Sequence, residues 1–301
     1  MEGTAGENKR KNFNPFKLKE TLACPICRGA LNQKGEEMIC VDAQHGPFLI
    51  DGAHRLHLMA GGDEDKYSKA HQGGINWLKS FLKQYPKLYY FTWNLFCPVL
   101  LSGKGPRAVL ALLTGHAPII LNLGSGPRRL GEEFINIDVF PFPEVDIVAD
   151  AAHLPFVDNS VDAVVSESLL EHVPDPHAVV REMTRVLKPG GILYTNTPFL
   201  TPYHASPDDF SRWTQSGLRS LFSEFAVIEE GVSAGPWSAL LVFLAYWLGV
   251  LFSFGSRRLA PVLGVLFMIP LGPLKFLDFL FARIPGSEAV AAQLYFIGKK
   301  K

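Results

Sequence analysis

The chain has 301 residues, of which 29 are basic and 29 acidic, so its formal net charge is zero. Hydrophobic residues make up 48% and charged residues 19%, which allows a sizeable core and excludes the basic excess typical of nucleic-acid binding. Residues 1–18 are rich in Lys, Asn and Glu and predict a flexible tail. Nothing in them resembles a secretory signal, so we expect a cytoplasmic setting with reduced or metal-bound cysteines.

A cysteine pair marks the start of residues 19–60, which we expect to form a small separate module. Cys24 and Cys27 enclose two residues, with a glycine close behind, a spacing that turns two thiolates toward one tetrahedral metal ion. Cys40 supplies a third thiolate, and His45 is the nearest candidate for a fourth ligand. Two interpretations stay open: a structural zinc ion, or a ribbon that folds without metal.

Residues 20–59 resemble the zinc ribbon of the methyltransferase-activator family. The likeness rests on the Cys-Pro-x-Cys motif at 24–27 and on the run Pro-Phe-Leu-Ile-Asp-Gly at 47–52. In the family a second Cys-x-x-Cys follows the first, but Ala43 stands at the last of these positions here. The resemblance implies a structural or recruiting role for the module, without a catalytic residue in it.

Residues 61–117 are mixed apolar and basic and predict a helical connector. Within them the segment 75–101 is rich in aromatic residues, and Trp77 and Phe81 stand at helical spacing. This pattern favours helices that pack on the core sheet. An aromatic surface at a substrate entrance or against lipid is the alternative. Cys97 stands alone, which indicates a small core residue and not a nucleophile.

Residues 118–301 show the alternating strand and helix patterns of an α/β domain. A buried apolar run ends in Gly124-Ser125-Gly126, where the glycines let a ligand approach the backbone. The short path from there to the next strand leaves little room for the usual helix. Asp175 caps a helix that we expect to end at Leu187. The predicted strands are Ile119–Leu123, Phe134–Asp138, Val145–Ala149, Ala163–Ser166, Ile192–Asn196, Ala226–Glu230 and Gln293–Lys299.

In this order the motifs resemble the class I S-adenosylmethionine (SAM) dependent methyltransferases of type 11. The likeness includes the run Leu154-Pro155-Phe156, the pair Glu171-His172 and the turn Lys188-Pro189-Gly190-Gly191. It implies an α/β, Rossmann-like sheet that is mostly parallel, with the last strand antiparallel and inserted beside the fifth. It also implies a methyl-transferring enzyme with SAM as its cofactor.

The resemblance further implies where SAM would bind. The turn formed by Gly124, Ser125 and Gly126 would hold its amino-acid part. Asn122 stands where most members carry an acid that contacts the ammonium group. Asp138, at the tip of the second strand, would grip both ribose hydroxyls, unless it is only a turn residue. The remaining candidates follow the third strand or end the fourth: Asp150, Ala151 and Ser166.

Histidines beyond the strand ends are candidate catalytic residues. His172 belongs to the family's Leu-Glu-His motif, and imidazole titrates near neutrality, so it would act as a general base or merely hydrogen-bond the backbone. His204, Asp209 and Arg212 lie in a run similar to that of one subfamily of these methyltransferases. They would form an acceptor site, or else a loop held by an Asp–Arg pair ahead of a helix capped at Thr214.

A long apolar insertion, residues 236–284, separates the last two strands. Residues 236–256 and 259–274 carry no charge, and the first run is just long enough to span a bilayer, which takes about 20 apolar residues. Because the chain must return to complete the sheet, a single crossing is excluded. A hairpin that dips into a membrane, helices in the membrane interface, and helices buried against residues 75–101 are the options. The uncharged length favours membrane contact.

The sequence thus predicts a cytoplasmic, membrane-associated SAM-dependent methyltransferase that acts on a small, apolar or lipid-linked acceptor, without a nucleic-acid partner. Two alternatives stay open. One is a non-catalytic membrane adaptor that keeps the fold, and the other is a protein or RNA methyltransferase recruited through the ribbon. Affinity for SAM separates the adaptor from the enzymes.

Overall fold

The computed structural model describes residues 18–35, 37–41, 45–59, 84–115, 117–205 and 208–301. The flexible tail expected at 1–18 therefore lies almost wholly outside the described residues. The same holds for the first part of the helical connector, including Trp77 and Phe81.

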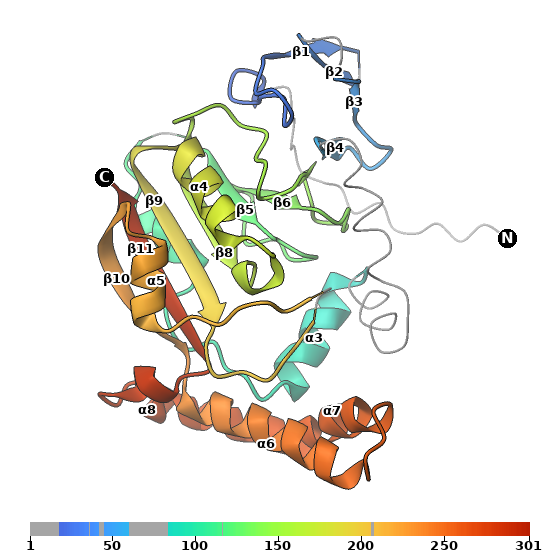
Figure 1. Ribbon diagram of the computed structural model, residues 1–301, viewed down its shortest axis with the longest axis vertical. Coiled ribbons are helices and arrows are strands. Elements are labelled where there is room, and N and C mark those ends of the chain that lie inside the picture. The colour runs from blue at the N-terminus through green and yellow to red at the C-terminus, as the bar shows by residue number, and fades with distance from the viewer. Residues whose placement is uncertain (1–17, 36, 42–44, 60–83, 116, 206–207) are drawn as a thin grey trace, which may run out of the picture.

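A twisted sheet with the strand order β10-β11-β9-β8-β5-β6-β7-β4 forms the centre of the molecule (Figure 1). Every neighbouring pair from β9 to β4 is parallel, whereas β11 runs antiparallel to both β9 and β10. This confirms the predicted class I methyltransferase sheet, with its last strand inserted beside the fifth. The strands are β4 (Leu56–His57), β5 (Ile120–Leu123), β6 (Phe134–Asp138), β7 (Ile147–Val148), β8 (Val161–Glu167), β9 (Leu187–Pro198), β10 (Phe225–Ala234) and β11 (Gln293–Lys300).

The fifth parallel strand begins earlier than the sequence predicts. Helix α4 (Pro176–Val186) passes directly into β9 at Leu187, and the Lys188–Gly191 run lies inside the strand. We expected Lys188–Gly191 to form a separate turn before the strand. The chain does bend there, at Gly190, whose positive φ of 76° glycine adopts readily. Asp175 caps α4 as predicted, with its side chain accepting from the backbone N–H of Ala178 at 3.0 Å.

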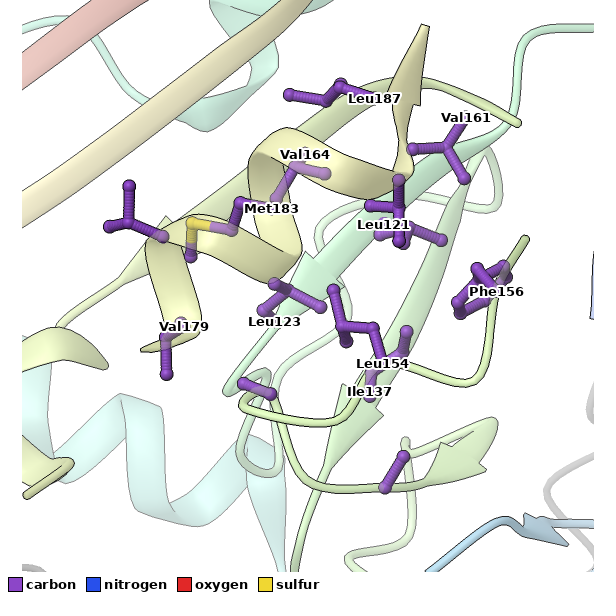
Figure 2. Packing of buried hydrophobic residues seen from close by; sticks show 14 of the residues in the cluster. Leu121, Leu123, Ile137, Leu154, Phe156, Val161, Val164, Val179, Met183 and Leu187 are labelled. Carbon is purple, nitrogen blue, oxygen red and sulfur yellow. The ribbon is translucent and has the colours of Figure 1, made fainter. Parts of the chain in front are cut away.

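Both faces of the sheet are covered, because alternate residues of each strand point to opposite sides. On one face α4 covers strand residues such as Leu121, Leu123 and Val164, and α5 (Gln215–Leu221) packs beside β10 (Figures 1 and 2). Figure 2 shows Val179 and Met183 of α4 in the same cluster as these strand residues. On the other face the 3₁₀ segment η3 (Pro106–Leu112) covers a second cluster that includes Ile120 and Tyr194.

The connection between β5 and β6 contains no helix within residues 124–133, as its short length predicts. A polar network fills part of this region. Arg129 lies 2.7 Å from the buried carboxylate of Asp146, which also accepts the backbone N–H of Asn136 at 2.8 Å. The compact connection is thus held by hydrogen bonds where a helix would otherwise pack.

The N-terminal module forms a three-stranded antiparallel sheet, β1 (Leu31–Lys34), β2 (Glu37–Cys40) and β3 (Phe48–Leu49). Its next strand, β4, leaves this small sheet and joins the edge of the central one beside β7. Asp51 braces the crossing, because it accepts hydrogen bonds from Arg55 at 2.6 Å and from His57 at 3.1 Å. Burial alone would raise the pKa of Asp51, but the hydrogen bonds from Arg55 and His57 lower it well below its usual range.

The apolar insertion folds into two adjacent helices, α6 (Pro236–Phe252) and α7 (Leu259–Leu271), followed by η5 (Gly272–Leu277) and α8 (Asp278–Phe281). Small residues let the two helices approach closely. A Cβ atom on Gly249 would lie 2.6 Å from the backbone nitrogen of Gly264. Many of the large side chains are exposed, among them Trp247 at 59%, whereas Leu241 and Val242 of α6 are buried.

Helix α3 (Pro86–Phe96) is the part of the aromatic segment 75–101 that the structure describes as a helix, and its main neighbours belong to the apolar insertion. It lies beside α7 and η5 (Figure 1), and Phe91 is 64% exposed. Helical spacing of aromatic residues defines an apolar face without identifying what covers it, and the packing predicted for Trp77 and Phe81 lies outside the described residues. Cys97, which follows α3, is buried as predicted, and burial raises the pKa of its thiol to about 11.

Two buried charges anchor the insertion to the rest of the domain. Lys275 donates to the backbone carbonyls of Asn94 and Cys97, at the end of α3. Asp278 is fully buried and accepts the backbone N–H groups of Trp237 and Ser238, at 2.9 and 2.8 Å, at the start of α6. Because these charges are used internally, they contribute little polarity to the outer surface of the helices.

Candidate active site

The glycine turn follows β5, at the carboxyl edge of the parallel strands. Gly124 and Gly126 both take positive φ values, 64° and 55°, where a side chain would add strain. A Cβ atom on Gly124 would meet Leu169 at 2.9 Å, whereas one on Gly126 would meet nothing within 4 Å. Leu169, which follows β8, therefore fills the space beside Gly124, whereas the space beside Gly126 is free for a ligand. Ser125 is buried, and its N–H donates to the carbonyl of Ile137 on β6 at 3.1 Å.

Asp138 ends β6 directly beside this turn. Its carboxylate accepts the backbone N–H of Gly126 at 2.8 Å and that of Phe140 at 2.9 Å. Asp138 thus fixes the glycine turn, and ribose hydroxyls would add to these bonds, because a carboxylate has about four acceptor positions. Asp150 follows β7 and accepts the N–H of Ala152 at 2.8 Å, with Ala151 buried next to it. The strands β5, β6 and β7 are neighbours, so the three predicted contacts come together at one edge.

Two other predicted cofactor residues lie inside the sheet. Asn122 is 4% exposed, and its amide donates to the side-chain oxygen of Asn136 at 2.9 Å. Ser166 is fully buried and shares a hydrogen bond of 3.0 Å with the hydroxyl of Thr195 on β9. The structure therefore groups the glycine turn, Asp138, Asp150 and Ala151 at the strand ends, and sets these two side chains apart in interstrand contacts.

The loop after β9 brings three predicted residues together. Arg212 pairs with both carboxylate oxygens of Asp209, and Asp209 accepts the backbone N–H of His204 at 2.8 Å. Burial alone would raise the pKa of Asp209, but the hydrogen bonds from Arg212 lower it to about 2. The Asp–Arg pair therefore holds the loop and fixes the position of His204.

His204 lies against the segment that follows β8. Its ring is 5.3 Å from that of His172, in an edge-to-face arrangement. The carboxylate of Glu171 lies between them, with Oε1 3.8 Å from the Nε2 atom of each histidine. The sequence motif contained Glu171, but sequence reasoning assigned it no role. The missing information was spatial, because nothing in the sequence shows that His204 returns to this strand end.

The N-terminal cysteines also form a cluster. The four candidate ligand atoms of Cys24, Cys27, Cys40 and His45 all lie within 4.8 Å of one another. The sulfurs of Cys27 and Cys40 lie 3.4 Å apart, and the Cys24 sulfur lies 3.6 Å from Nδ1 of His45. Tetrahedral zinc, with bonds of about 2.0–2.3 Å, separates its ligand atoms by roughly 3.5–3.8 Å, so the group fits this ion.

The mostly parallel sheet with its antiparallel last strand is the fold of the class I methyltransferases. The family described as "Methyltransferase domain" matches residues 130–195, which confirms the type 11 resemblance for this segment. This part of the chain is a methyltransferase domain, and SAM is the cofactor of that class, as the sequence predicted.

Two curated relatives and one solved structure show how far the similarity extends. An arsenite methyltransferase of Aquipseudomonas alcaligenes is 33% identical over 139 residues, which are 39% of this chain and 40% of that protein. A demethylmenaquinone methyltransferase of Renibacterium salmoninarum is 45% identical over 69 residues, 20% of this chain and 29% of that protein. A putative sarcosine dimethylglycine methyltransferase from Galdieria sulphuraria is 16% identical, with a TM-score of 0.43 over 73% of this chain and 98% of that one. The chain thus spans two fifths or less of the length of these two curated relatives.

Proposed function

We propose that the protein is a SAM-dependent methyltransferase that acts on an apolar or lipid-linked acceptor at a membrane surface. The observation that carries the first part is the juxtaposition of the glycine turn with Asp138 and Asp150 at the ends of β5, β6 and β7. In open α/β sheets, ligands bind at the carboxyl ends of the strands. Gly124–Gly126 would hold the amino-acid part of the cofactor, Asp138 the ribose, and Asp150 with Ala151 the adenine.

The bound cofactor supplies an electrophilic methyl group, and the chain's own residues would position the acceptor and take its proton. His172 and His204 lie within reach of each other beyond β8 and β9, where an acceptor would meet the cofactor. Either imidazole could remove the acceptor proton, with Asp209 fixing the backbone of the loop that carries His204. Alignment of the two reactants would supply most of the acceleration.

The apolar insertion supports a membrane-borne acceptor. Strand β10 runs parallel to β9, since both are antiparallel to β11, so α6 begins at the carboxyl edge where the cofactor site lies. In Figure 1 the arrowhead of β9 points toward the end of the molecule that α6 and α7 form. A lipid-linked acceptor held in a membrane at this end would have a short path to the site.

The surface of the insertion has the composition that a bilayer requires. The helical segment Leu259–Phe281 is long and apolar enough to cross a membrane, and only 17% of its most apolar window is buried. Small residues line the contact between α6 and α7, whereas large apolar side chains face outward, an arrangement found in lipid. Arg257 and Arg258, at the turn between the helices, would meet lipid phosphates, which favours helices lying at the cytoplasmic interface.

The cysteine cluster would bind one structural zinc ion. Its ligand distances support this role, and the N–H of Gly29, 3.4 Å from the sulfur, lowers the pKa of Cys27 to about 7, which favours the thiolate that zinc needs. Because β4 extends the central sheet, the zinc would stabilise the edge next to β7.

Calorimetric titration with SAM tests the proposed activity. The wild-type chain should bind one equivalent, and Asp138→Ala should abolish binding, because the variant loses both the ribose contact and the bond that holds Gly126. Asp158→Asn changes an exposed carboxylate that precedes β8, at the amino ends of the parallel strands and not at the carboxyl ends where the glycine turn lies, and should bind like the wild type. A folded wild type that binds no SAM would refute the enzyme and support the adaptor. If the enzyme methylates protein or RNA and not an extracted lipid, the alternative of a methyltransferase recruited through the N-terminal ribbon is supported.

A further inference from the structure

A fully buried carboxylate stands without a hydrogen bond at the carboxyl edge of the sheet. Glu171 belongs to η4 (Leu170–His172), and its side chain is 0% exposed. Neither carboxylate oxygen has a hydrogen-bond partner among the residues that the structure describes. An ionised carboxylate in this environment is costly unless a positive charge compensates it.

The two histidines beside Glu171 present their Nε2 atoms to it. Nδ1 of His172 lies 2.6 Å from the carbonyl oxygen of Asp208. A carbonyl only accepts, so Nδ1 carries the proton in the neutral ring, and Nε2 is left with a lone pair that faces Glu171. Metal-bound histidines in proteins are commonly fixed in this way, with the second nitrogen donating to a carbonyl or carboxylate.

The surroundings of His204 favour the same tautomer. Its Nδ1 is 3.2 Å from the carbonyl of Pro202 and 3.5 Å from the carboxylate of Asp209, and both are acceptors. Arg212 also lies 3.3 Å from Nδ1, but the two hydrogens of that Arg212 nitrogen already have acceptors in the carboxylate of Asp209 at 2.6 Å and the carbonyl of Pro202 at 3.2 Å. A proton on Nδ1 again leaves Nε2 directed at Glu171.

We propose that Glu171, His172 and His204 bind a divalent transition-metal ion. The candidate ligand atoms of the three residues lie within 4.8 Å of one another. The two distances of 3.8 Å are too long for hydrogen bonds. They exceed by about 0.4–0.8 Å the spacing of roughly 3.0–3.4 Å between the ligand atoms of an ion with bonds of about 2.1 Å, so the side chains would draw slightly together on binding. Two imidazoles and one carboxylate suit iron(II), zinc, cobalt(II) or manganese(II) better than calcium.

The metal site deepens the proposed function without depending on it. Three protein ligands leave coordination positions open, as in catalytic metal sites, and an oxygen of water or of the acceptor could occupy one of them. The ion would then activate the acceptor in place of an imidazole base. Binding of the ion requires neither SAM nor an acceptor, so it can be measured alone.

Cobalt(II) titration of the metal-free, full-length protein tests this site. Calorimetry gives the number of ions bound, and absorption gives their ligands, because thiolate-bound cobalt has an intense charge-transfer band that nitrogen and oxygen ligands lack. Besides any cobalt bound by the cysteine cluster, the wild type should bind one further ion that gives no thiolate band. Glu171→Gln and His204→Ala should weaken that binding at least tenfold and leave any thiolate-bound cobalt unchanged. His177→Gln, which changes an exposed histidine of α4, is the matched control and should bind like the wild type.

The cysteine cluster serves as an internal reference for folding. A variant that keeps the wild-type circular dichroism but loses only the ion bound through nitrogen and oxygen supports the site. Unchanged binding in both variants would overturn it, as would a wild type that binds cobalt only through thiolates or not at all. A variant that does not fold leaves the wild-type titration and the other variant to decide. Failure of this test would leave SAM binding unaffected, which keeps the two proposals distinguishable.

Discussion

Replacement of Phe254 by serine is the sharpest test of membrane contact through the insertion. Phe254 lies in the turn between α6 and α7 and is 91% exposed. Since it contributes almost nothing to the protein core, Phe254→Ser should change the free energy of unfolding by less than about 0.5 kcal/mol. Any effect on vesicle binding would therefore not arise from unfolding.

The expected loss of lipid affinity follows from the exposed surface. Burying a phenylalanine side chain contributes about 1.5–3 kcal/mol, and nearly all of the Phe254 side chain is available for insertion. A loss of this size corresponds to a partition coefficient about 10- to 150-fold lower.

Sedimentation with lipid vesicles measures this partition coefficient directly. Leu49→Ser is the matched control, because Leu49 is an exposed apolar residue, 52% accessible, in the N-terminal module at the opposite end of the molecule (Figure 1). It should bind vesicles like the wild type. Equal partitioning of Phe254→Ser and the wild type would show that the turn does not enter lipid. If the wild type does not bind vesicles at all, the apolar surface must serve another purpose.

Two further predictions concern stability. Asp278→Ala removes the buried acceptor of two backbone N–H groups at the start of α6 and should lower the free energy of unfolding by about 2 kcal/mol in urea titration. Asp158→Asn weakens only the ion pair of an exposed carboxylate with Arg185 and should cost less than about 1 kcal/mol. An equal effect of both would contradict the anchoring role. Asp51→Asn should cost about 2 kcal/mol at neutral pH, because hydrogen bonds to the charged form hold the pKa of Asp51 below its unfolded value. This contribution of the Asp51 carboxylate to stability is fully present above the unfolded pKa of about 4 and is lost as the pH falls toward the lower pKa of the folded protein. The free energies of unfolding of wild type and variant should therefore converge in acid. A difference between them that stays constant from neutral pH to about pH 3 would contradict this origin.

Local patterns were sufficient to predict the central sheet. Apolar runs that end in Gly124 or Asp138 identified β5 and β6 within a residue, because strand identity depends on neighbouring side chains and glycine marks where the backbone must turn. The missing helix after β5 followed from chain length alone. By contrast, β7 is limited to Ile147–Val148 and β9 extends back to Leu187, since strand ends depend on which partner strand lies alongside.

The sequence by itself determined the class of fold, the glycine turn and the acids that follow the strands, because these are properties of adjacent residues. Only the tertiary structure decided what each polar side chain faces. It turned Asn122 toward Asn136, and it brought His204 to Glu171 through a loop whose path no spacing rule predicts. It also placed the apolar side chains of the insertion outside, since composition measures how apolar a helix is and packing alone determines which face is covered.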